Sequence, residues 1–154
     1  MVWYPYNLDR EAQNLVLNYR DLEDVLNESH KMRTTVAYGL ERFWGEHLRL
    51  IDKEDSKDRN KGEYWRDTWK AFVKIMNEAG MTTIPKGEVN VKNTHEIKET
   101  ARQFWNSEEF PLEDQRIALA VLTQFCDSLV WWTQRYKNKD KSNKRKNKEN
   151  HETE

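Results

Sequence analysis

Apolar residues recur at helical spacing through the first part of the chain. Between residues 8 and 26 they alternate in steps of four and three, and a similar spacing returns between residues 31 and 52. Steps of this size bring side chains to one face of an α-helix, so the pattern predicts two helices. The polar segment between them contains neither Pro nor Gly, which leaves one long helix as an alternative. The first apolar face consists of Leu8, Ala12, Leu15, Tyr19, Leu22 and Leu26.

The second half of the chain predicts further helices. Residues 52–62 carry no apolar side chain and predict an exposed loop. The third helix follows this loop and ends before Gly80, a residue suited to a left-handed C-cap. A fourth helix begins near Asn93 or Thr94, because Asn93 and Glu96 have the spacing of a capping box.

Proline positions indicate the remaining boundaries. Pro85 and Gly87 lie within residues 81–93, which predict a long connection, with a small extended hairpin as an alternative. Pro111 suits the first turn of a fifth helix that ends near Tyr136. This last helix is the most apolar of the five, as expected for the central helix of a bundle.

Together these patterns predict an all-α bundle of about five helices, with residues 1–137 forming a single domain. Residues 138–154 are rich in lysine and lack apolar side chains, so we expect a disordered basic tail. Trp105 and Trp132 lie at helical spacing and are predicted to be buried. Trp131 cannot share the direction of Trp132 on a helix, so one of that pair is predicted to lie near the surface. The strongest apolar faces add to the predicted core the side chains of Trp65, Trp69, Phe72, Val121, Phe125 and Leu129.

The composition limits which classes of protein this chain can belong to. The chain has 26 Lys and Arg against 27 Asp and Glu, so attraction to a polyanion would depend on how these charges are arranged. The single cysteine, Cys126, excludes an internal disulfide, and its apolar surroundings predict a core residue. No apolar run approaches the roughly 18 residues of a membrane span, and the N-terminus lacks the pattern of a signal peptide. We therefore expect a soluble, cytoplasmic protein.

One short motif is similar to known chemistry. Arg42 and His47 stand five residues apart, as in HEPN ribonucleases, small helical proteins in which a dimer pairs two such motifs to cut RNA. That family usually places a polar residue after the arginine, whereas Phe43 and Trp44 follow here, and Gly45 loosens the helix. We expect structural roles for the pair and no enzyme, with a ribonuclease as the alternative. Scattered histidines and the lack of a glycine-rich phosphate loop predict no metal and no cofactor.

A basic stripe on the third helix is the main candidate for binding. Arg66, Lys70 and Lys74 recur every four residues beside the tryptophan face. Cations at this spacing can neutralise phosphates and release counterions without any contact to a base. An ordinary solvated helix face is the alternative interpretation. Cations of the later helices complete the predicted nucleic-acid-binding set with Lys98, Arg102, Arg116, Arg135 and Lys137.

The whole chain resembles the small subunits of class 1 CRISPR effector complexes, of the Cascade or type III kind. The resemblance is one of architecture: a small helical chain with basic faces, surplus aromatics and the closing helix "RIALAVLTQFCDSLVWWTQRYK". It implies a bundle that helps to hold guide and target strands. In several such systems the small subunit is similar to the C-terminal domain of the large subunit, and the start "MVWYPYNLDREAQN" fits translation from inside that gene.

The expected function is therefore that of a non-catalytic nucleic-acid-binding subunit of an antiviral ribonucleoprotein complex. The resemblance implies several copies per complex, with guide RNA, target DNA or RNA and other subunits as partners, and no membrane. A helical protein–protein adaptor without a nucleic-acid role remains a further alternative.

Overall fold

The computed structural model describes residues 5–137, and the chain is all-helical in this range, with no strand. The predicted all-α bundle is confirmed, with six α-helices in the described part where about five were expected. The predicted disordered tail lies outside the described residues. The elements are α1 Pro5–Tyr19, η1 Val25–Asn27, α2 Glu28–Thr35, η2 Val36–Tyr38, α3 Leu40–Leu50, α4 Ser56–Glu78, α5 Thr94–Trp105 and α6 Leu112–Tyr136.

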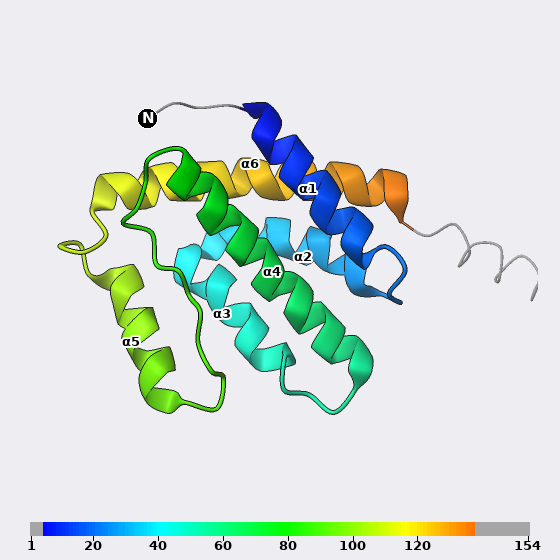
Figure 1. Ribbon diagram of the computed structural model, residues 1–154, viewed down its shortest axis with the longest axis horizontal. Coiled ribbons are helices and arrows are strands. Elements are labelled where there is room, and N and C mark those ends of the chain that lie inside the picture. The colour runs from blue at the N-terminus through cyan, green and yellow to red at the C-terminus, as the bar shows by residue number, and fades with distance from the viewer. Residues whose placement is uncertain (1–4, 138–154) are drawn as a thin grey trace, which may run out of the picture.

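Helices α6 and α4 organise the bundle (Figure 1). α1 and α2 pack on α6, while α3 packs mainly on α4. α5 lies at one side of the molecule, and the connection between α4 and α5 descends between these two helices (Figure 1). This arrangement leaves one long face of α4 at the surface and places α3 between the main bundle and α5.

The first half of the chain is more broken than the apolar pattern predicts. The predicted first helix ends at Tyr19, and the predicted second helix is divided into α2 and α3. Asp24 has a left-handed backbone with φ 64°, and Gly39 has φ 103°, so neither residue continues a right-handed helix. The alternative of one long helix is therefore wrong, and Leu22 is an exposed turn residue instead of part of the buried face.

The predicted loop at residues 52–62 is also mostly wrong, because α4 begins at Ser56. The Asp55 carboxylate accepts a hydrogen bond from the Lys57 backbone N–H at 2.8 Å and caps the helix. Lysine and arginine are good helix formers, so the start of α4 can be helical even though it has no apolar side chain. At the other end Gly80 has φ 96° and confirms the predicted C-cap.

The caps of the last two helices follow the sequence closely. The Asn93 side chain accepts from the Glu96 backbone N–H at 3.1 Å, as a capping box requires. In a full capping box the Glu96 carboxylate would accept from the backbone N–H of Asn93. Here it accepts from the backbone N–H of Asn90 instead, at 2.8 Å. Pro111 stands immediately before α6, which ends at Tyr136 as predicted. The extended hairpin suggested for residues 81–93 does not form.

The predicted core is buried, with one error among the tryptophans. Trp65, Trp69, Phe72, Val121, Phe125 and Leu129 are all buried, as is Cys126. Of the adjacent pair, Trp131 is exposed and Trp132 is partly buried against the core, as expected for two side chains that point in different directions. Trp105 is exposed, so its predicted burial is wrong. Adjacent helical residues point about 100° apart, and Phe104 takes the inward direction.

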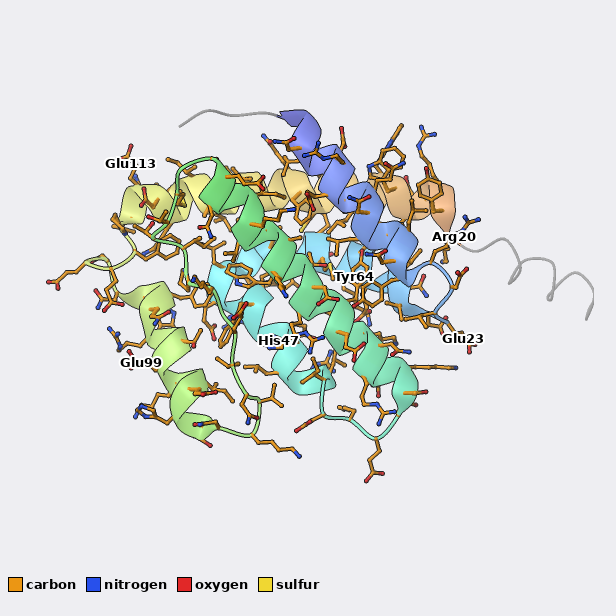
Figure 2. The ribbon with its side chains drawn as sticks, in the orientation of Figure 1. Arg20, Glu23, His47, Tyr64, Glu99 and Glu113 are labelled. Carbon is orange, nitrogen blue, oxygen red and sulfur yellow. The ribbon has the colours of Figure 1, made fainter. Side chains whose placement is uncertain are left out.

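Polar contacts at the centre of the bundle join three helices. The Ser29 and Tyr64 hydroxyl oxygens lie 2.7 Å apart, and the Thr133 hydroxyl donates to Ser29 at 2.7 Å. Burial raises the pKa of Tyr64 well above its usual range, so its hydroxyl is neutral at every physiological pH. Figure 2 shows Tyr64 and His47 among the helices, whereas Glu99 and Glu113 extend outward. These contacts fix α2, α4 and α6 relative to one another.

Candidate nucleic-acid interface

Two tryptophans hold the connection between α4 and α5 in place. The Trp44 indole N–H donates to the Gly87 carbonyl at 2.9 Å. The Trp69 indole N–H lies 3.1 Å from the Lys86 carbonyl and 3.3 Å from the Pro85 carbonyl. Both rings are buried, so these hydrogen bonds are shielded from competing water. The backbone around Lys86 is therefore fixed relative to α3 and α4.

Gly87 is required by this arrangement. Its φ of 73° lies in the left-handed region, where a side chain is strained. A Cβ atom there would lie 2.6 Å from Trp44 Cδ1 and 2.9 Å from Trp69 Nε1. The glycine thus allows the backbone to approach the two indoles closely enough to be hydrogen-bonded by them.

A hollow of about 240 Å³ lies between α3, α4 and this fixed connection. Arg66 and Lys70 line it from α4, and Lys86 lines it from the connection. All three cations are exposed. Lys70 and Lys86 form no hydrogen bond or ion pair through their side chains with any described residue. We call this cavity the pinned hollow; it brings two cations of the predicted stripe together with one that the sequence did not indicate.

The carboxylates of the pinned hollow are Asp67 and Glu88. The Tyr19 hydroxyl donates to Asp67, and the Arg66 guanidinium lies 3.6 Å from the same carboxylate. Burial and the Asp67 contact raise the pKa of Tyr19, which keeps this donor protonated. Asp67 is therefore occupied by neighbours within the protein, and the three cations outnumber the carboxylates.

His47 lines the pinned hollow from α3, and its side chain is almost wholly buried. Its Nδ1 lies 2.6 Å from the Trp44 carbonyl oxygen, which accepts a hydrogen bond when Nδ1 carries the proton. Burial lowers the pKa of His47 below its usual range, the Arg66 charge acts in the same direction, and the Trp44 contact opposes both. The imidazole is consequently neutral near pH 7.

Arg42 and His47 do not meet within the chain. Five residues along a helix correspond to a rotation of about 140°, so the two side chains leave α3 in different directions. Arg42 is exposed, lies over the Tyr38 ring at 5.8 Å and lines a second hollow that does not include His47. The spacing of the motif is present, but the fold assigns its two residues to separate surroundings.

The other predicted cations are dispersed. Lys74 continues the α4 stripe but forms an ion pair with Glu11 of α1 at 3.3 Å. Arg102 of α5 is held by Glu99 at 2.6 Å and Glu109 at 3.2 Å, and these contacts raise the pKa of Arg102. Arg135 lies 4.0 Å from the centre of the Trp131 ring. The remaining members of the predicted set are exposed on α5 and at the two ends of α6, namely Lys98, Arg116 and Lys137.

Lys86 is the residue of the pinned hollow that sequence reasoning missed. A lone lysine between Pro85 and Gly87 carries no periodic signal, and its position depends on hydrogen bonds from distant tryptophans. A glycine so close to a proline indicates a connection and nothing more specific. No local pattern shows that this connection returns to α4.

Within residues 5–137, no group of three or more His, Cys, Asp or Glu side chains is arranged to hold a metal ion. Among the described helices, none combines the length and apolar character needed to cross a membrane.

Comparison with protein-family models, with curated proteins and with solved structures gave no match to the chain.

Proposed function

We propose that the chain is a non-catalytic nucleic-acid-binding protein that contacts phosphates through the pinned hollow. The observation that carries this proposal is the placement of Arg66, Lys70 and Lys86 around one cavity, on backbone that the fold holds rigid. Backbone that is already ordered loses little entropy when a ligand binds, so these cations contribute more of their attraction to affinity.

The distribution of charge supports a local site over a general attraction. Six of the 26 basic residues and four of the 27 acidic residues lie after Lys137, so residues 5–137 carry a small net negative charge. A polyanion is thus not attracted by the folded region as a whole, and phosphates must find a restricted cationic surface. Contacts of this kind set affinity and register and carry no base specificity.

Following the resemblance to small subunits of class 1 CRISPR effector complexes, we place this activity in a multi-subunit ribonucleoprotein. In that setting the pinned hollow contacts the backbone of a guide or target strand, and other subunits supply sequence recognition. The all-helical fold and the exposed face of α4 are compatible with this role.

The test is a salt titration of binding to a fluorescent single-stranded RNA and to the matching DNA. The triple variant Arg66→Ala, Lys70→Ala, Lys86→Ala should weaken binding and reduce the slope of log K against log salt. The reduction should be about 0.7 for each phosphate that the variant no longer neutralises. A control that removes three cations outside the pinned hollow, each of them paired with a carboxylate, should change the slope much less: Arg33→Ala, Arg49→Ala, Arg102→Ala. In the pinned hollow only Arg66 has such a partner, Asp67, while Lys70 and Lys86 have none among the described residues.

Two outcomes would contradict the proposal. One is a wild-type protein that binds neither oligonucleotide at low salt. The other is an equal loss of oligonucleotide affinity in the two triple variants. That result would show that binding depends on the number of cations and not on their position in the pinned hollow. Removal of residues 138–154, which lie outside the described residues, is expected to reduce affinity less than the triple variant of the pinned hollow.

A further inference from the structure

The pinned hollow contains a histidine that phosphate contact by lysine and arginine alone does not use. The His47 side chain is only 3% exposed, yet it lines this hollow from α3. Histidine is the residue type whose ordinary pKa lies between pH 5 and 8, and His47 is the one histidine in the lining. At ordinary pKa values, it is therefore the only lining group whose charge changes in this pH range.

The contact with Trp44 decides which nitrogen of His47 remains available. A carbonyl oxygen only accepts hydrogen bonds, so the Nδ1 that lies 2.6 Å from the Trp44 oxygen carries the proton. A neutral imidazole has one such proton, which leaves Nε2 as an acceptor. Nε2 forms no hydrogen bond with another described residue. Any polar partner of Nε2 must therefore come from outside the described part of the chain.

Nε2 also keeps access to solvent. Two polar side-chain atoms among the described residues are fully enclosed without a hydrogen bond, Glu28 Oε2 and Trp132 Nε1. His47 Nε2 lacks a hydrogen bond but is not one of these atoms, so it is not fully enclosed. A phosphate that enters the pinned hollow can approach it. An ionised phosphate oxygen only accepts hydrogen bonds, so contact with Nε2 requires a second proton on the imidazole.

The charges around the hollow determine when that proton is bound. α4 and the connection supply its charged lining, which consists of Arg66, Asp67, Lys70, Lys86 and Glu88. α3 adds no charged group besides His47 itself. Burial is the main cause that lowers the pKa of His47, and the Arg66 charge also lowers it. A phosphate among these cations would neutralise them and place a negative charge near the imidazole, which favours the protonated form.

We propose that a phosphate in the pinned hollow binds together with a proton, which His47 takes up from solvent at Nε2. The Nε2–H of the imidazolium then donates to a phosphate oxygen, and its charge adds to those of the lysines and the arginine. Affinity for phosphate therefore rises as pH falls below neutrality, and a rise in pH favours release. The inference rests on the proposed function, because it assigns a nucleic-acid phosphate to this hollow. It adds His47 to the binding residues and makes the contact dependent on pH.

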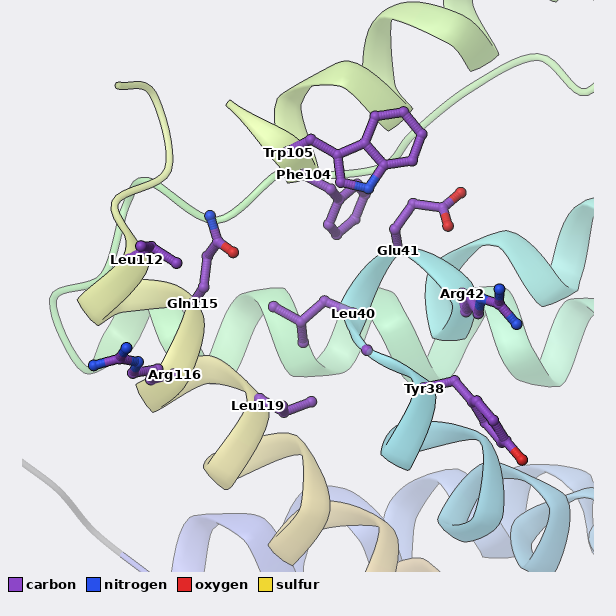
Figure 3. A pocket seen from close by; sticks show the side chains of 11 residues that line it. Tyr38, Leu40, Glu41, Arg42, Phe104, Trp105, Leu112, Gln115, Arg116 and Leu119 are labelled. Atoms are coloured by element: carbon purple, nitrogen blue, oxygen red, sulfur yellow. The ribbon is translucent and has the colours of Figure 1, made fainter. Parts of the chain in front are cut away.

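The second hollow provides a comparison within the same chain. Arg42 and Arg116 line it toward opposite sides, with Leu40 and Leu119 between them (Figure 3). No described histidine lines it. The charge of its lining is thus constant between pH 5.5 and 7.5 at ordinary pKa values. The double variant Arg42→Ala, Arg116→Ala should therefore retain the pH dependence of binding, whereas the triple variant of the pinned hollow should lose it.

The first test measures affinity for an oligothymidylate without terminal phosphates, at constant ionic strength between pH 7.5 and 5.5. Neither its phosphodiesters nor thymine changes charge in this range, and the fluorescent label is one insensitive to pH. The association constant of the wild type should rise severalfold per pH unit as pH falls, with about tenfold as the limit for one linked proton. His47→Gln should flatten this rise. Equal slopes in the wild type and His47→Gln would overturn the proposal.

His95→Gln is the matched control for this test. His95 is an exposed histidine of α5 that lines neither hollow, and its protonation adds only to the general attraction of a polyanion. His95→Gln should therefore keep nearly the whole wild-type slope. If it flattens the slope as much as His47→Gln does, the pH dependence comes from net charge and the proposal is wrong.

The second test observes His47 in the wild type, so it does not depend on the folding of a variant. The pH titration of the His47 Cε1–H resonance is followed by NMR with and without the oligothymidylate. It is repeated with sodium sulfate against sodium chloride of equal ionic strength, because sulfate is a tetrahedral anion that stays ionised throughout this range. Both the oligothymidylate and sulfate should raise the pKa of His47. In the triple variant Arg66→Ala, Lys70→Ala, Lys86→Ala, neither should do so.

The outcomes separate this inference from the proposed function. If the pinned hollow binds the oligothymidylate but neither anion raises the pKa of His47, the proton linkage is wrong and the proposed function stands. If the oligothymidylate does not bind but sulfate raises the pKa, the hollow takes up an anion with a proton, and its assignment to nucleic acid is wrong. A rise that persists in the triple variant would place the anion elsewhere and overturn the inference.

Discussion

The pinned hollow and the second hollow, which is lined by Arg42, Trp105 and Arg116 and which we call the open hollow, both lie beside α3. Tryptophans line both of them. In the pinned hollow Trp44 and Trp69 are buried, and their N–H groups hold backbone carbonyls in place. In the open hollow Trp105 is mostly exposed. A buried indole with a satisfied N–H stabilises the fold, whereas an exposed one among apolar neighbours is available to a partner. The residue type is the same, and burial separates its two uses.

The largest expected effect tests that separation directly. Trp44→Ala should lower the free energy of unfolding by about 3–5 kcal/mol, because it leaves a large cavity and frees the Gly87 carbonyl. Trp105→Ala should cost less than about 0.5 kcal/mol, since most of its side chain already faces water. Urea unfolding at low protein concentration measures both. Similar losses in the two variants would contradict the distinction between the hollows.

Gly87→Ala is expected to have the next largest effect, about 2–3 kcal/mol, because it adds a clash with both indoles to the strain of a positive φ. Gly80→Ala is the matched control. Gly80 also has a positive φ, but no neighbouring atom lies within 4 Å of its Cβ position, so only the strain of a left-handed backbone, about 1 kcal/mol, is expected there. Equal losses in thermal or urea unfolding would show that the indoles do not restrict the connection.

The helix pattern predicted the all-α fold, the start of α5 and the bounds of α6 well, because the Asn93 cap of α5 and Pro111 before α6 act locally. The break at Gly39 was missed because the apolar spacing from Val36 through Leu40 to Phe43 continues past the glycine. Helical spacing favours burial for both Phe104 and Trp105, and only packing against Trp44 and Trp69 shows which of the two faces inward.

The candidate site was less predictable than the fold. Helical spacing correctly placed Arg66 and Lys70 on one exposed face of α4. It could not show that Lys74 is paired with Glu11 or that Lys86 joins the site, because both facts depend on how separate segments pack. Binding by these residues remains a prediction.

A smaller effect concerns pH and His47. The unfolded chain takes up a proton near the ordinary pKa of 6.5, while burial lowers the pKa of His47 in the folded protein. The unfolded state therefore binds more protons as pH falls below about 6.5, and stability decreases there by at most about 1.4 kcal/mol per pH unit. Above that pH the contribution is fully present. His47→Gln should flatten this part of the curve, measured by urea unfolding between pH 7.5 and 5.5. Parallel curves for the two proteins would show that His47 titrates as it does in the unfolded chain.

The smallest expected effects are those of single surface cations, and they compare the two hollows in binding. Lys70→Ala and Arg116→Ala each remove one exposed positive charge that has no ion-pair partner among the described residues, so any general attraction to a polyanion falls equally. Because we assign phosphate contact to the pinned hollow, Lys70→Ala should lower the salt slope of single-strand binding by about 0.7. Arg116→Ala should leave it unchanged, because Arg116 lies outside the pinned hollow. Neither change should alter stability by more than about 0.5 kcal/mol. If Arg116→Ala lowers the slope as much as Lys70→Ala, the nucleic acid contacts both hollows, and the division of roles between them is wrong.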